Sequence, residues 1–224
     1  MPILVITLLL LLLLFGPNLW VQYVLRRHSK PRDDFPGTGG EFAHHLLNRL
    51  GLPQVTVEAT DSGDHYDPAK HAVRLTVDKL DGKSLTAVVI AAHEVGHALQ
   101  HKLDYPPLRW RSRLAGLATL AQQLGNGLFM LAPVVGGITH APGAALIFAA
   151  AGLASFGSAA LVHLATLPVE WDASFRRALP VLEAGDYLRG DDLGRARQIL
   201  TAAALTYVAG SLASLLNLWR WFRR

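Results

Sequence analysis

Three long stretches without a charged side chain constrain the fold of this chain most strongly. Residues 3–25, 114–169 and 198–219 contain no Asp, Glu, Lys or Arg, although 17% of the 224 residues are charged. A hydrocarbon core about 30 Å thick needs about 20 apolar residues in a helix to cross it. We therefore expect one membrane helix in the first stretch and two in the second. The third could form one more, or it could instead pack on the hairpin or lie in the membrane interface.

The other segments are polar enough to form one compact catalytic or binding unit beside these helices. Five parts are predicted: an N-terminal anchor at 1–25, a catalytic part at 26–113, a helical hairpin at 114–167, a polar helical region at 168–198, and a C-terminal membrane helix with a basic end at 199–224. Lys and Arg border the apolar stretches, and such residues collect on the cytoplasmic side of a membrane. The predicted protein crosses a membrane several times, with its polar parts in the cytoplasm.

Composition excludes several kinds of chemistry and favours one kind of partner. The chain has no cysteine, so disulfides, Cys-ligated zinc, iron–sulfur clusters and thiol catalysis are excluded. The net charge is only +4, and Arg residues cluster beside the apolar stretches. This distribution favours a lipid bilayer as partner and argues against nucleic acid.

The polar unit is predicted to combine helices with short strands. Residues 53–58 and 72–77 alternate between apolar and polar side chains, which is typical of strands. We expect 72–77 to be an edge strand, with which an extended substrate could pair. Ser84 is a candidate cap for a helix over 85–101. The run 64–67 is expected to be a turn that shapes the cleft. Either Tyr66 or His65 could stabilise an oxyanion, and the sequence does not decide between them.

The sharpest chemical signal is the sequence His93-Glu94-Val95-Gly96-His97. Residues four apart lie on one face of a helix, so His93 and His97 can present two imidazoles to one metal. Glu94 is then placed beside the open metal position, where it can take a proton from water. Two imidazoles with an open position are typical of catalytic Zn²⁺ sites, which use three protein ligands.

The third ligand must come from another part of the chain. Glu170 is the best candidate, because it follows the uncharged hairpin directly and Pro168 suits the first turn of a helix. Ser174 lies four residues later and could hydrogen-bond a metal-binding histidine. His101 is a weaker candidate, because three ligands on one straight helix would span about 12 Å.

These motifs together resemble a known family. Asp64-His65-Tyr66-Asp67-Pro68, the block Ala91–Gln100, Leu167-Pro168-Val169-Glu170 and Leu200–Ala209 are similar to the YugP-type family of bacterial membrane-bound neutral zinc metallopeptidases. The resemblance implies a gluzincin in which His93, His97 and Glu170 bind Zn²⁺ and Glu94 is the catalytic base. It also implies a bacterial plasma membrane and a polypeptide substrate, with membrane proteins among the candidates.

The sequence therefore predicts a mainly α membrane protein, with a zincin-like α+β catalytic unit joined to transmembrane helices. Its expected activity is zinc-dependent endopeptidase hydrolysis by a metal-activated water. Two alternatives use the same residues. One is a non-catalytic membrane scaffold that keeps zinc for folding, and the other is a zinc hydrolase of a non-peptide substrate.

Overall fold

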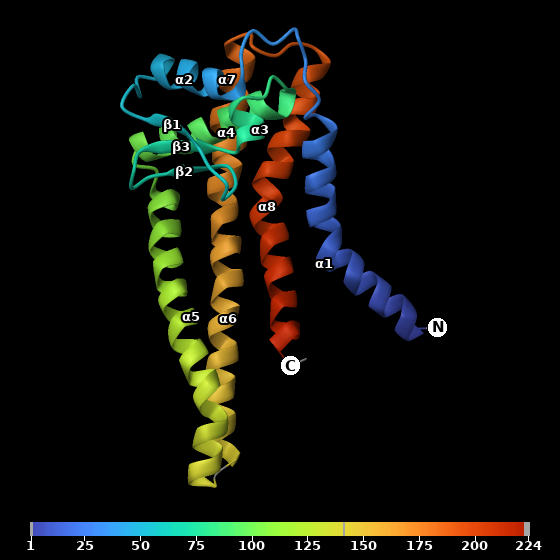
Figure 1. The fold of residues 1–224 in the computed structure, drawn as a ribbon, viewed down its shortest axis with the longest axis vertical. Helices are drawn as coiled ribbons and strands as arrows, with labels where there is room; N and C mark the ends of the chain where they lie inside the picture. The colour runs from blue at the N-terminus through green and yellow to red at the C-terminus, as the bar shows by residue number, and fades with distance from the viewer. Residues whose placement is uncertain (1, 141, 222–224) are drawn as a thin grey trace.

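The computed structural model describes residues 2–140 and 142–221. The protein is mainly helical, and Figure 1 shows a head of short elements from which the long helices α1, α5, α6 and α8 extend. The elements in chain order are α1 (Pro2–Arg27), α2 (Gly39–Arg49), β1 (Thr56–Ala59), β2 (His65–Asp67), β3 (Ala72–Leu75), α3 (Val77–Leu80), α4 (Leu85–Lys102), α5 (Pro106–Thr139), α6 (Pro142–Trp171), the π-helix η1 (Asp172–Ala178), α7 (Leu179–Ala184) and α8 (Asp191–Trp221).

The sheet is mixed, with the strand order β1-β3-β2. β3 runs parallel to β1 and antiparallel to β2. The prediction that 72–77 is an edge strand is therefore wrong, because β3 is the central strand. The run predicted as a turn forms β2 at the edge, and the chain then reverses in a tight turn where the Asp67 carboxylate accepts hydrogen bonds from the amides of Ala69 and Lys70.

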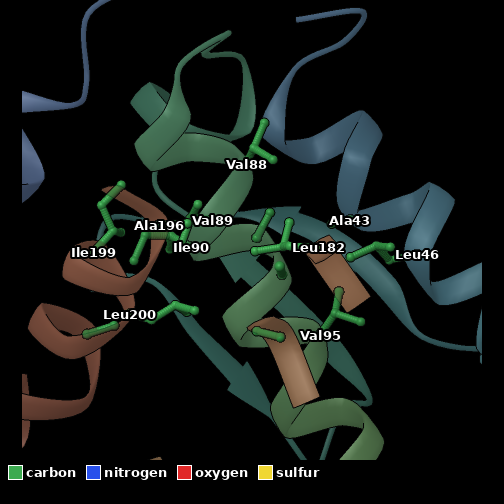
Figure 2. Packing of buried hydrophobic residues seen from close by; sticks show 14 of the residues in the cluster. Ala43, Leu46, Val88, Val89, Ile90, Val95, Leu182, Ala196, Ile199 and Leu200 are labelled. Atoms are coloured by element: carbon green, nitrogen blue, oxygen red, sulfur yellow. The ribbon is translucent and has the colours of Figure 1, made fainter. Parts of the chain in front are cut away.

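Helix α4 is the centre of the head. It begins at the predicted place, because the Ser84 hydroxyl accepts a hydrogen bond from the Ala87 amide at 3.1 Å and caps the helix. Almost every side chain from Leu85 to Ala98 is buried. Figure 2 shows why: apolar side chains of α2, α7 and α8 surround it, and the labelled ones are Ala43, Leu46, Leu182, Ala196, Ile199 and Leu200.

The uncharged second stretch forms a long helical hairpin of α5 and α6, which reaches furthest from the head in Figure 1. Within the described residues, however, no helix has both the length and the hydropathy needed to cross a membrane. The predicted fold class, a mainly α membrane protein with transmembrane helices, is therefore wrong. In α5 the physical reason is visible in the sequence: Gln122, Gln123 and Asn126 lie at mid-helix, so a lack of charge is not the same as high hydropathy.

The last predicted membrane helix, 199–224, corresponds to the main part of α8 (Asp191–Trp221). Part of its predicted basic end, residues 222–224, lies outside the described residues. At its first turns α8 packs against the head, where Ala196, Ile199 and Leu200 are fully buried. The first turns of α8 therefore cover one side of α4.

Candidate metal centre

His93, Glu94 and His97 lie in the most buried part of α4. Their exposed fractions are only 4%, 5% and 5%. Buried imidazoles and carboxyl groups need polar or metal partners, because their desolvation is otherwise costly. The sequence prediction that the two histidines share a helix face holds, since their ring centroids are 4.8 Å apart.

Glu170 reaches the same point from the end of α6 and is completely buried. Its Oε2 atom lies 3.2 Å from His93 Nε2 and 3.1 Å from His97 Nε2. Together the three residues offer ligand atoms that all lie within 4.8 Å of one another. Tetrahedral zinc with bonds of about 2.0–2.1 Å places neighbouring ligand atoms about 3.3 Å apart. The donor set and its spacing thus fit a zinc ion.

Hydrogen bonds leave the Nε2 atom of each histidine available for a metal. Ser174 Oγ lies 3.1 Å from His93 Nδ1 and donates its own proton to the Leu200 carbonyl at 3.2 Å, so the serine accepts from the imidazole. His97 Nδ1 lies 2.9 Å from Gln100 Oε1, which can only accept a hydrogen bond. Ser174 was a sequence candidate for this role, whereas Gln100 was not.

Gly96 allows the segment after Glu170 to approach α4 closely. A Cβ atom at this position would lie 2.8 Å from the Ala173 carbonyl oxygen in η1 and 3.4 Å from Arg177 Cβ. The glycine inside the histidine motif therefore has a packing reason that the sequence did not reveal. It lets the helix with two histidines and the segment with the glutamate lie in direct contact.

The two carboxyl groups of the site have opposite electrostatic environments. Burial raises the pKa of Glu94 from its ordinary value of 4.5 to about 7. Burial alone would also raise the pKa of Glu170, but His97 and His93 beside it hold that pKa well below its usual range. Glu170 is thus a stable anion suited to a metal, and Glu94 is suited to exchanging a proton near neutral pH.

The second oxygen of Glu170 faces a cation. Glu170 Oε1 is buried and has no hydrogen-bond partner among the described residues. Arg111 Nη1, from α5, lies 3.7 Å away from it. Arg111 was not a sequence candidate, because an arginine before an apolar stretch was interpreted as a membrane-flanking charge.

The site opens into a cavity of about 420 Å³. One wall consists of Asp64, His65 and Tyr66, at and just before the edge strand β2, and α4 contributes the histidines and Glu94. Several long helices contribute apolar side chains to the lining, among them Leu25 of α1, Leu108 and Ala115 of α5, and Ala203 of α8.

The remaining sequence candidates lie beside the metal centre and are not part of it. His101 accepts or donates a hydrogen bond at Nδ1 with the Tyr66 hydroxyl at 2.8 Å, and is not in the group of converging ligand atoms. His65 Nδ1 bonds the Gly63 carbonyl at 2.8 Å. The Asp64 carboxylate accepts from the Thr76 amide at 2.7 Å, which ties the start of β2 to the end of β3.

Two comparisons with known proteins agree with this donor set. Residues 3–224 match the family model described as "Putative neutral zinc metallopeptidase". The chain is also 34% identical over 211 residues to "Putative membrane protease YugP" of Bacillus subtilis (strain 168), and the match covers 92% of this chain and 90% of that protein. No solved structure matches the chain. The family match and the buried His/His/Glu cluster together show that the chain belongs to this family of neutral zinc metallopeptidases.

Proposed function

We propose that the protein is a zinc-dependent endopeptidase in which His93, His97 and Glu170 bind the metal and Glu94 is the general base. One observation carries the proposal: three buried ligand atoms converge at the wall of a cavity, and a carboxyl group with a pKa near neutrality lies beside them. A structural metal site needs no such neighbour. When bound, zinc would polarise the scissile carbonyl and acidify a water molecule.

Glu94 would perform the proton transfers of the reaction. As a carboxylate it accepts a proton from the attacking water, and as a carboxylic acid it delivers that proton to the leaving amine. Its pKa of about 7 suits both steps, because a general base works best when its pKa is close to the working pH. The carboxylate form is favoured at and above neutral pH, so hydrolysis is expected to rise as the pH increases through the neutral range.

The edge strand in the cavity wall supports a polypeptide as the substrate. β2 lies at one edge of the sheet and also forms part of the cavity wall. An extended peptide can add to such an edge through main-chain hydrogen bonds, whatever its sequence. The apolar lining residues Leu25, Leu108 and Ala203 would then contact the side chains of that peptide.

The proposal is tested by Glu94→Gln, which preserves the shape of the side chain and removes the base. We expect purified Glu94→Gln protein to contain as much zinc as the wild type and to leave an unfolded polypeptide uncut. Cleavage at the wild-type rate would contradict the assigned role of Glu94. Zinc in the wild type without cleavage of any polypeptide would instead favour the scaffold or the non-peptide hydrolase.

We also propose that the protein associates with a lipid bilayer, as the name of its Bacillus subtilis relative says of that protein. Large apolar side chains are exposed along α5, among them Leu117, Leu124 and Ile138. Extended exposed apolar surface of this kind marks a partner surface. Flotation of the purified protein with phospholipid vesicles is the expected result, and protein that stays at the bottom of the gradient would contradict it.

A further inference from the structure

Gln100 is a buried polar side chain in the head that takes no part in the proposed reaction. It lies on α4 three residues after His97, and it is completely buried. A buried amide is stable only when its donors and acceptor have partners. All of them do, and the partners come from both halves of the metal centre.

The acceptor of the Gln100 amide acts on His97. Oε1 lies 2.9 Å from His97 Nδ1, so the proton of the imidazole is held on Nδ1. The opposite nitrogen, Nε2, lies 3.1 Å from Glu170 Oε2 and is the atom that would bind the metal. This contact selects the imidazole tautomer that can bind a metal through Nε2.

The donors of the same amide act on the segment that contains Glu170. Nε2 of Gln100 donates to the Val169 carbonyl at 2.9 Å and to Asp172 Oδ2 at 2.8 Å. These two acceptors fix the orientation of the amide, because an oxygen in that position would face two other oxygens. Val169 immediately precedes Glu170, and Asp172 follows it by two residues, where α6 ends and η1 begins.

Asp172 is itself held in place from the other side. It is buried, and its Oδ2 also accepts a hydrogen bond from Arg177 Nε at 3.1 Å. Asp172 is not among the converging ligand atoms, and it contacts Gln100.

We propose that Gln100 is a positioning residue that joins the two parts of the metal centre, orienting His97 with its carbonyl and holding the backbone around Glu170 with its amide. The inference rests on the proposed metal centre and goes beyond it, because it assigns the coupling between ligands 73 residues apart to one side chain. Removing the partners of a metal-binding histidine typically weakens metal binding about 10–100-fold.

The test uses the full-length protein and measures its zinc affinity by competition with a chromophoric chelator. Gln100→Met has a similar volume but no hydrogen bonds, and we expect zinc to bind about 10–100-fold more weakly. Gln100→Glu still accepts from His97, but it turns a carboxylate toward Val169 and Asp172, so a similar loss is expected. The visible absorption of the Co²⁺-loaded proteins should also change, because it reports the geometry of the ligands.

A double variant separates positioning from a simple loss of stability. In Gln100→Glu combined with Asp172→Asn, the new amide donates to the new carboxylate, so the hydrogen bond between the two positions is restored in the reverse direction. The new carboxylate still faces the Val169 carbonyl, and Arg177 Nε loses its acceptor. We therefore expect part of the zinc affinity lost in Gln100→Glu to return, because the two changes interact directly. Thr166→Val is the matched control, since Thr166 is also buried but its hydroxyl donates to the Val162 carbonyl of its own helix.

Two results would overturn the inference: wild-type zinc affinity and Co²⁺ spectrum in both single variants at position 100, or no recovery in the double variant. These measurements contain no substrate. A wild-type protein that binds zinc but cleaves no polypeptide would therefore contradict the proposed function and leave the role of Gln100 standing.

Discussion

The buried carboxyl group of Glu94 should make the metal-free protein less stable as the pH rises. Its pKa is raised from 4.5 to about 7 by burial, and an unfolded chain restores the ordinary value. One pKa unit corresponds to about 1.4 kcal/mol, so ionising Glu94 in the folded state costs about 3 kcal/mol more than in the unfolded state. This stabilising contribution of the neutral acid is fully present below pH 4.5 and is lost as the pH rises through about 7.

Glu94→Gln removes this ionisation while keeping the size of the side chain. The free energy of unfolding of the metal-free variant, minus that of the metal-free wild type, should therefore grow by about 2 kcal/mol between pH 5 and pH 7 and then level off. The variant is expected to be the more stable protein at pH 8 and the inactive one. The gain in stability and the loss of activity have the same cause, because the variant lacks the buried carboxyl group that acts as the base.

Urea unfolding in the presence of a chelator, repeated from pH 5 to pH 8, measures this difference. Groups that do not interact with Glu94 are common to both proteins and cancel in the comparison. Glu183→Gln is the control, because Glu183 is an exposed glutamate on α7 and its replacement should leave the wild-type pH dependence unchanged. A stability difference for Glu94→Gln that is independent of pH would refute the burial argument.

Changes at three other positions test separate contacts of the site. Glu170→Ala should lower zinc content and peptidase activity together, and Glu170→Asp should do so partially, because the shorter side chain misplaces the oxygen; normal zinc content in the alanine variant would contradict its role as ligand. Gly96→Ala should lower the free energy of unfolding by about 1–3 kcal/mol and weaken zinc binding, since its Cβ would press on η1; chemical denaturation with a parallel zinc titration measures both. Ala203→Trp should raise KM for a polypeptide without changing zinc content, because Ala203 lines the cavity and is not one of the ligands; steady-state kinetics that match the wild type would exclude Ala203 from substrate binding.

The part of the site that lies on one helix could be predicted from the sequence. His93 and His97 are four residues apart, and helix geometry alone places them on one face. Ser84 as the cap of α4 followed from its position before an apolar run. Glu170 was found by a weaker argument, because it follows the hairpin, and the structure brings it to the two histidines.

The contacts between distant segments could not be predicted. Gln100 and Gly96 act on η1, about 70 residues later, and no local pattern reports such a contact. The prediction that 72–77 is an edge strand was wrong for a similar reason. Alternation identifies a strand but does not say which strands it pairs with. The transmembrane prediction was wrong because it relied on missing charge, whereas Gln122 and Asn126 lower the hydropathy of the uncharged part of α5 without adding charge.

The most direct test of the account is X-ray absorption at the zinc edge of the purified, zinc-loaded protein. It measures the kind and number of atoms bound to the metal. The account predicts two imidazole nitrogens and one or more oxygens at about 2.0–2.2 Å, and loss of an oxygen contribution from the protein in Glu170→Ala. A spectrum without imidazole scattering, or one that Glu170→Ala leaves unchanged, would contradict the metal centre of His93, His97 and Glu170.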